Sequence, residues 1–245
     1  MMRKIFFLFC ILILFVTTGY ISWLAVPLEP LPETQDTMTS NDLIEVTIND
    51  WHVFQPTMHT PKTGLIFYPG ARIDAQAYSP AAQVIAAQGF LVVVVPMPLN
   101  LALLGPDRAM AVINEFSEIE HWVVGGHSLG GAQAGLFAQD HLDVIDGLVL
   151  WGAYPTEDNN LSVTDIEVTA IFGTRDGLVT PDEIEAARLL LPSTTEWVFI
   201  EGGNHAQFGW YGEQQNDLPA TIGLEVQQWQ ATDATVELLQ RVEEN

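Results

Sequence analysis

The stretch HWVVGGHSLG, residues 121–130, joins a short apolar run to a serine flanked by glycines. His121–Gly125 has the composition of a buried strand, and the small residues after the serine predict a helix. A serine hydroxyl is a poor nucleophile unless it is exposed, held in place and close to a base. A tight strand-to-helix turn provides that position, and Gly126 and Gly130 relieve the backbone crowding in such a turn. The stretch therefore predicts a nucleophile at Ser128; the alternative is a plain strand–turn–helix junction with a capping serine.

Two later strand ends carry a carboxylate and an imidazole. Asp176 follows the apolar run that ends near Phe172, and His205 follows the next run, which ends near Ile200. Glycines lie beside both polar residues and allow the backbone to turn and present them. An imidazole can take the proton of a serine hydroxyl and return it to the leaving group. The sequence thus provides a serine, a carboxylate and an imidazole, the three groups that nucleophilic catalysis by a serine uses.

With these residues, the sequence resembles the α/β-hydrolase family, whose members place serine, acid and histidine in this order. The resemblance covers Leu65 to Val242 and is closest to the small, cap-less carboxylesterase-like and dienelactone-hydrolase-like members. It implies that His205 is the general base and that Asp176 fixes the imidazole tautomer. Asp182 and Glu183 are weaker candidates for the acid, because first-turn acids are favoured by the helix dipole alone.

The same resemblance implies an oxyanion hole made of two backbone N–H groups. One would come from Leu129, the residue after the nucleophile, and the other from the loop after Leu65–Tyr68. That loop often begins His-Gly in the family, whereas it reads Tyr-Pro-Gly-Ala here. We expect Ala71 as the second donor, with Arg72 as the alternate. The Arg72 side chain could also attract an acidic substrate group or form a surface ion pair.

The rest of the pattern alternates between strand and helix, which is typical of an α/β protein with a mainly parallel sheet covered on both faces. The predicted strands are residues 44–48, 51–54, 65–68, 90–95, 122–125, 148–151, 168–172 and 197–200. The predicted helices are residues 80–88, 106–116, 129–139, 181–191 and 233–242. Only Gly152–Asp165 could hold an insertion over the site, and it is too short for a large cap. Apolar residues that could line an acyl or alcohol pocket, or simply pack in the core, are Met97, Leu99, Leu101, Leu103 and Leu104.

The N-terminus predicts a membrane segment. Arg3 and Lys4 precede Ile5–Val26, which has no charged residue and could span roughly 33 Å as a helix. We expect residues 1–26 to be an uncleaved anchor, with a cleaved signal as the alternative, since no Ala-x-Ala site follows. Either way, the positive-inside rule places the remaining chain on the extracytoplasmic side. We expect residues 27–42 to be an extended, Pro- and acid-rich linker and residues 43–245 to be the single domain.

The charge balance excludes some partners. The chain has 31 acidic residues against 8 Lys and Arg, for a net charge of −23. Such a surface repels nucleic acid, and it disfavours docking onto anionic lipid headgroups. The single cysteine, Cys10, cannot form an internal disulfide, and the histidines show no metal-ligand spacing. We expect no cofactor and no metal, and contact with the membrane through the N-terminal segment only.

These observations favour an exported serine hydrolase that cleaves acyl esters of small molecules through an acyl-enzyme. A peptidase, amidase or thioesterase could use the same residues, and a noncatalytic binding protein could keep the fold. The last alternative is disfavoured, because all three residues of the triad are present. Neither the identity of the ester nor the oligomeric state follows from the sequence.

Overall fold

The computed structural model describes residues 26–244. The expected membrane segment over residues 1–26 therefore lies outside the described part of the chain, apart from Val26. Within residues 26–244, no helix is both long and apolar enough to cross a membrane.

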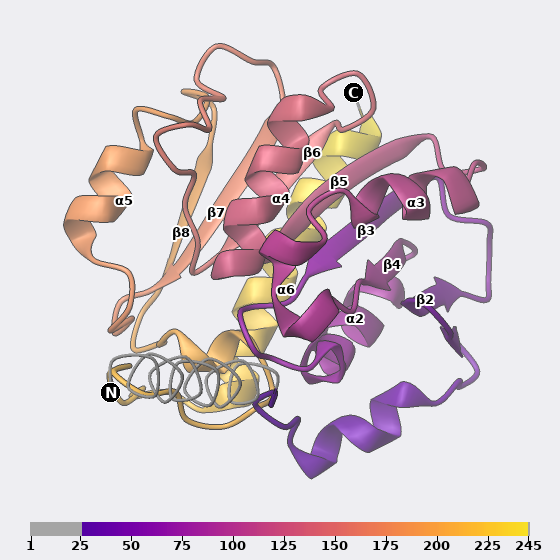
Figure 1. Ribbon diagram of the computed structural model, residues 1–245. Coiled ribbons are helices and arrows are strands. Elements are labelled where there is room, and N and C mark those ends of the chain that lie inside the picture. Colours follow the sequence, from indigo (N-terminus) through magenta and orange to yellow (C-terminus); the bar gives the residue numbers. More distant parts are fainter. Residues whose placement is uncertain (1–25, 245) are drawn as a thin grey trace, which may run out of the picture.

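The described chain folds into one eight-stranded sheet with helices on both faces (Figure 1). The strand order is β1-β2-β4-β3-β5-β6-β7-β8. Strands β3 to β8 run parallel, whereas β1 pairs antiparallel with β2 and β2 pairs antiparallel with β4. The strands are β1 (Ile44–Ile48), β2 (His52–Pro56), β3 (Thr63–Tyr68), β4 (Leu91–Val94), β5 (His121–His127), β6 (Gly147–Trp151), β7 (Glu167–Gly173) and β8 (Glu196–Ile200). The helices are α2 (Ser79–Ala86), α3 (Arg108–Glu115), α4 (Leu129–Asp140), α5 (Pro181–Ala187) and α6 (Leu224–Glu244), with short 3-10 helices η1 (Pro32–Met38), η2 (Ala75–Tyr78), η3 (Pro98–Asn100), η4 (Ala102–Leu104) and η5 (Ala206–Phe208).

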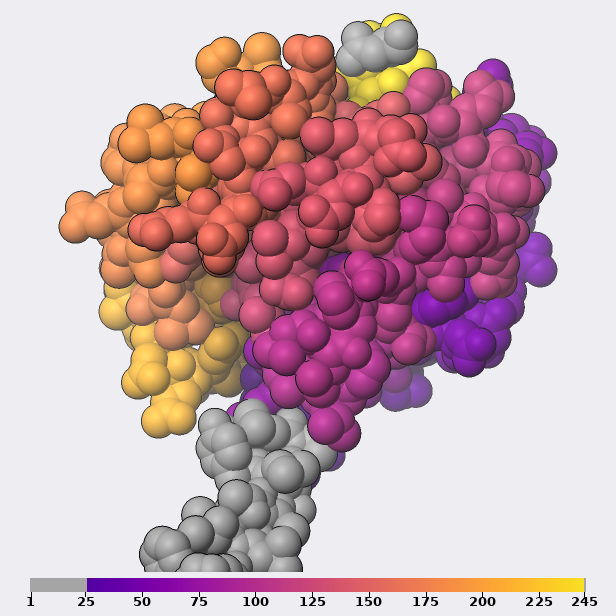
Figure 2. Space-filling model, turned by 45° about the horizontal axis from the view of Figure 1, so that its top comes forward, coloured from indigo at the N-terminus to yellow at the C-terminus, as the bar shows by residue number. Residues whose placement is uncertain are grey.

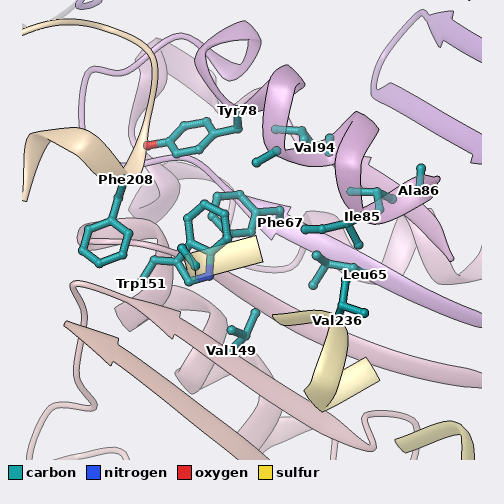
Figure 3. Packing of buried hydrophobic residues seen from close by; sticks show 14 of the residues in the cluster. Leu65, Phe67, Tyr78, Ile85, Ala86, Val94, Val149, Trp151, Phe208 and Val236 are labelled. Atoms are coloured by element: carbon teal, nitrogen blue, oxygen red, sulfur yellow. The ribbon is translucent and has the colours of Figure 1, made fainter. Parts of the chain in front are cut away.

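Two cores lie on the two faces of the sheet, because successive side chains of a strand point to opposite sides. Along β3, Leu65 and Phe67 join the core under α2 and α6, while Ile66 and Tyr68 join the core under α3, α4 and α5. In the first core, the rings of Phe67 and Trp151 meet edge to face at 4.8 Å between centroids (Figure 3). The predicted α/β class, with a mainly parallel sheet and both faces covered, is confirmed.

The segment over residues 27–42 differs from the extended linker that we expected. It forms η1 and packs against the domain, where Thr34 is fully buried and the Gln76 amide donates to its hydroxyl at 2.8 Å. Leu28 forms a parallel bridge with Ile73 at the end of the loop after β3. These hydrogen bonds offset the polarity of the segment, so the folded unit extends to the start of the described chain instead of beginning at residue 43.

The order of the parallel strands determines where a ligand would bind. From β3, the chain proceeds to one side through β4 and to the other side through β5. Ligands of open α/β sheets bind at the carboxyl ends of the strands, where the order reverses in this way. Ser128 follows the last residue of β5 and therefore lies at this switch point.

Candidate active site

Ser128 occupies a tight turn between β5 and α4, and its backbone is strained. Its φ of 52° and ψ of −125° are rare for a residue with a side chain, and such strain is often found at functional sites. A Cβ on Gly126 would lie 2.5 Å from the Tyr68 carbonyl oxygen, and one on Gly130 would also collide with the end of β3. Both glycines are therefore needed for the close approach of the turn to β3. This approach places the partly exposed Ser128 at the carboxyl end of β5.

His205 and Asp176 meet at the carboxyl ends of β7 and β8. Their side chains are only 1% and 2% exposed, and His205 Nδ1 lies 2.8 Å from Asp176 Oδ2. The other carboxylate oxygen accepts from the backbone N–H groups of Leu178 and Val179, each at 2.8 Å. The carboxylate is thus fixed on both sides, and it holds the imidazole so that Nε2 is the nitrogen available for other chemistry.

Ser128 and His205 share neighbours, although no hydrogen bond joins their side chains. The ring of His127, which precedes Ser128, lies 4.5 Å from the ring of His205 between centroids. Ser128 N–H donates to the Trp151 carbonyl, and a Cβ on the following residue, Gly152, would lie 3.1 Å from His205 Nδ1. His205 Nε2 is buried and has no hydrogen-bond partner among residues 26–244. Hydrogen bonds between a catalytic hydroxyl and its base are often long in the absence of substrate, and they shorten when substrate binds.

The alternative acids lie elsewhere. Asp182 and Glu183 are in the first turn of α5, where Glu183 forms a capping box with Thr180. Glu183 also accepts from the Tyr154 hydroxyl at 2.6 Å, and this hydrogen bond holds the pKa of its carboxyl below the usual value. Both positions match the expected first-turn acids and not a partner of His205.

The loop after β3 carries Ala71 and Arg72, the two residues that we expected as possible second donors to an oxyanion. Arg72 N–H already donates to the Asn100 carbonyl at 2.7 Å, whereas no described residue accepts from Ala71 N–H. Leu129 N–H lies in the first turn of α4, where backbone donors have no partner within the helix. The geometry thus favours Ala71 over Arg72 as the second donor. The Arg72 guanidinium donates to the Val26 carbonyl at 3.2 Å.

Tyr78 supports this loop through its hydroxyl, a role that the sequence did not predict. Gly70 N–H donates to the Tyr78 hydroxyl at 3.0 Å, and the same hydroxyl lies 2.9 Å from His127 Nδ1. Burial raises the pKa of Tyr78, so the hydroxyl keeps its proton; burial and the neighbouring His205 hold the pKa of His127 well below its ordinary value. Nδ1 of a neutral His127 can accept a hydrogen bond from the Tyr78 hydroxyl. This chain of contacts links the residue before the nucleophile to the oxyanion loop.

Asp217 is a second residue that sequence patterns did not indicate. One of its carboxylate oxygens accepts from Gly177 N–H at 2.9 Å, and the other accepts from Ala206 N–H at 2.8 Å. Gly177 follows Asp176 and Ala206 follows His205, so Asp217 ties together the two loops that carry the pair. Asp217 also lines a hollow of about 400 Å³ beside Asn204 and Ala206.

The segments around the site are short. Residues 152–166 form a loop without helix or strand, as expected for a protein without a large cap. Of the apolar residues after β4, Met97 is buried in the core, whereas Leu99, Leu103 and Leu104 are about half exposed. No group of three or more His, Cys, Asp or Glu side chains that could hold a metal ion occurs within residues 26–244.

The fold and this arrangement of residues define a class. The chain belongs to the alpha/beta hydrolase family, whose sequence model matches residues 64–230.

Solved structures with the same fold share little sequence with this chain. Est1E from Butyrivibrio proteoclasticus, solved with ferulic acid, is 15% identical with a TM-score of 0.59, over 84% of this chain and 98% of its own. The butyrate-bound esterase Est2 from Thermogutta terrifontis is 13% identical with a TM-score of 0.59, over 82% of this chain and 95% of its own. A predicted CIB-like hydrolase from Thermoplasma acidophilum is 15% identical with a TM-score of 0.56, over 81% of this chain and 97% of its own. A search of curated proteins returns no match.

Proposed function

We propose that this protein is a serine hydrolase that cleaves carboxylic esters through an acyl-enzyme on Ser128. Ser128 Oγ attacks the ester carbonyl while His205 Nε2 takes its proton and then returns it to the departing alcohol. A water molecule, deprotonated by the same nitrogen, then attacks the acyl carbonyl and releases the carboxylic acid. Asp176 stabilises the imidazolium in both steps.

The backbone N–H groups of Leu129 and Ala71 stabilise the oxyanion of each tetrahedral intermediate. Such preorganised donors stabilise charge where it develops, and the loss of one typically lowers kcat by about 10²- to 10³-fold. Tyr78 acts indirectly as a positioning residue, because its hydroxyl accepts from Gly70 N–H next to the proposed donor. The positive end of α4 adds to this stabilisation.

The observation that carries the proposal is the buried hydrogen bond between His205 Nδ1 and Asp176 Oδ2 at 2.8 Å, beside a strained Ser128. A buried carboxylate–imidazole pair is costly to form unless it is hydrogen-bonded, and this bond leaves Nε2 as the imidazole nitrogen without a partner among residues 26–244. We take a carboxylic ester as the substrate class. The esterase Est2, solved with butyrate, and Est1E, solved with ferulic acid, have the same fold and support this choice.

Hydrolysis of p-nitrophenyl butyrate by the full chain in detergent tests this function. We expect turnover by the wild type, and a loss of kcat of about 10⁴-fold or more in both Ser128→Ala and His205→Ala. His59→Ala is the matched control, because His59 is exposed and should retain wild-type turnover. Wild-type turnover in His205→Ala would refute the assignment of the base. Turnover of a matched anilide or thioester instead of the ester would move the substrate class to amides or thioesters.

We also propose that residues 1–26 anchor the protein with its domain on the extracytoplasmic side. The proposal is supported by the uncharged run Ile5–Val26, preceded by Arg3 and Lys4. Alkaline carbonate extraction of membranes should leave the full chain in the pellet, and protease added from outside should degrade the domain. A soluble chain whose N-terminus begins after residue 26 would instead show a cleaved signal.

A further inference from the structure

The described chain begins beside the proposed oxyanion loop. Leu28 N–H donates to the Arg72 carbonyl at 2.5 Å, and the Arg72 guanidinium donates to the Val26 carbonyl at 3.2 Å. Ala71 is the residue before Arg72, so the apolar run that ends at Val26 joins the domain next to the proposed oxyanion loop. The point of attachment is therefore beside the oxyanion loop, at the carboxyl ends of the parallel strands, where ligands of such sheets bind. We call this side of the domain the entrance.

Exposed leucines surround the same entrance. Leu99, Leu103 and Leu104 are 49%, 50% and 47% exposed and flank Asn100, whose carbonyl accepts from Arg72 N–H. The segment that carries them is the magenta part at the lower edge of the surface in Figure 2. Three large apolar side chains on one short segment are costly in water unless another apolar phase covers them.

The backbone of this segment is held in an unusual shape. Leu99 and Asn100 have φ values of 52° and 54°, in the left-handed region that a leucine rarely adopts. Arg72, on the facing loop, has a φ of 60°. The segment keeps this shape through hydrogen bonds: Asn100 N–H donates to the Met97 carbonyl at 2.9 Å, and the Asn100 carbonyl accepts from Arg72 N–H at 2.7 Å. These bonds hold the segment beside the oxyanion loop.

From these contacts, we infer that the site opens onto the membrane surface and that its substrates are acyl esters of uncharged or zwitterionic membrane lipids. This inference rests on the proposed function and the proposed anchor. Residues 1–25 lie directly before Val26, so an anchored domain has its entrance at the bilayer, where the leucines insert among the headgroups. The domain would then contact the membrane through these leucines as well, and not through the N-terminal segment only, as the sequence led us to expect. The net charge of −23 disfavours anionic lipid and selects the neutral class.

The reaction with such a lipid is the same ester hydrolysis. Ser128 Oγ forms a bond to the acyl carbonyl carbon, and the bond from that carbon to the glycerol oxygen breaks. The glycerol oxygen takes the proton from His205, and water releases the fatty acid from Ser128. The lysolipid and the fatty acid both stay close to the interface that supplied the substrate.

The test compares a lipid ester with a soluble ester in the same preparation. The full chain is reconstituted into phosphatidylcholine vesicles that contain phosphatidylcholine with a fluorescent acyl chain, and p-nitrophenyl butyrate is the soluble substrate. We expect release of the fluorescent acid by the wild type, and faster release than from the same amount of fluorescent phosphatidylglycerol in phosphatidylglycerol vesicles. In Leu103→Ser/Leu104→Ser, the ratio of lipid to soluble turnover should fall about tenfold or more.

Leu142→Ser is the matched control. Leu142 is 43% exposed and lies beside His121 at the amino ends of the strands, away from the entrance, so its ratio should equal that of the wild type. Hydrolysis of the soluble ester without release of the fluorescent acid would overturn the inference and leave the proposed function standing. If the wild type hydrolysed neither the soluble ester nor the lipid ester, the proposed function would be refuted as well. A dimer in detergent that the leucine variant dissociates would overturn the inference too, because a second copy would then cover the leucines.

Discussion

The two sides of the candidate site are held in place by different means. On the base side, Asp176 and His205 contact each other directly, and Asp217 joins their two loops through backbone N–H groups. On the oxyanion side, the loop at Gly70–Arg72 contains no such pair of side chains. This loop is held by two hydrogen bonds: Gly70 N–H donates to the Tyr78 hydroxyl, and Arg72 N–H donates to the Asn100 carbonyl.

The difference shows how chemistry and support are distributed in this fold. In the proposed mechanism, the base side carries the groups that gain or lose protons, so its side chains must contact one another. The oxyanion side would contribute backbone N–H groups, so the position of these groups depends on residues that hold the backbone in place. The base side should therefore fail sharply when one side chain is changed, whereas the oxyanion side should fail by degrees.

Removal of the charge on the base side should have the largest effect. In Asp176→Asn, the imidazolium loses its counter-ion and the tautomer of His205 is no longer fixed, so kcat for p-nitrophenyl butyrate should fall by about 10³- to 10⁴-fold. Glu183→Gln is the matched control for the choice of acid, and its kcat should stay within a few-fold of the wild type. A larger loss in Glu183→Gln than in Asp176→Asn would reverse the assignment.

A smaller effect is expected when the oxyanion loop loses its support. In Tyr78→Phe, the buried Gly70 N–H is left without its acceptor, a loss worth about 1–3 kcal/mol. We expect kcat to fall by about 10- to 100-fold with little change in KM, because the loop acts on the transition state and not on ground-state binding. Tyr154→Phe is the control on the other side of the sheet. A rise in KM at constant kcat would show that Tyr78 serves binding only.

The tie between the two loops of the base side should matter less than the pair itself. In Asp217→Asn, an amide nitrogen replaces one of the oxygens that accept from Gly177 and Ala206 N–H, so one of these two hydrogen bonds is lost. We expect kcat to fall about tenfold. The exposed Asp182 provides the control, since Asp182→Asn removes the same charge at the start of α5. Equal activity of the two variants would contradict the positioning role of Asp217.

The smallest effect concerns stability and not rate. The folded protein keeps His127 neutral, with a pKa well below its ordinary value. In the unfolded chain, His127 binds a proton below about pH 6.5, whereas the buried His127 of the folded protein does not. The free energy of unfolding therefore decreases as the pH falls below that value, by up to about 1.4 kcal/mol per pH unit, until the pKa of His127 in the folded protein is reached. Between pH 7.5 and pH 5, the free energy of unfolding, measured by thermal unfolding, should therefore decrease less in His127→Gln than in the wild type. Parallel curves would mean that His127 is not the group responsible.

The sequence predicts the base side better than the oxyanion side, and the reason is physical. Asp176 and His205 follow apolar runs that read as strands, so their place at the carboxyl edge of the sheet follows from the pattern. Tyr78 and Asp217 bond to backbone N–H groups of distant loops, and a hydrogen bond to the backbone leaves no residue pattern in its partner. The same limit applies to Thr34, whose burial depends on the Gln76 amide.

Helix α6 shows a related limit in the fold. It begins at Leu224, whereas the apolar spacing predicts a helix only from Asp233. Its first turns bury Gln227 and Gln228, which hydrogen-bond to the backbone of Asn204 and Gln207. Polar residues buried in this way do not produce the apolar period from which helices are predicted.

The most direct test of the account is covalent labelling of the nucleophile. The full chain in detergent is treated with a fluorophosphonate probe at mildly alkaline pH, and the modified peptide is identified by mass spectrometry. The account predicts one labelled residue, Ser128, with labelling abolished in Ser128→Ala and slowed strongly in His205→Ala. Absence of labelling in the wild type, or labelling that persists in Ser128→Ala, would contradict it.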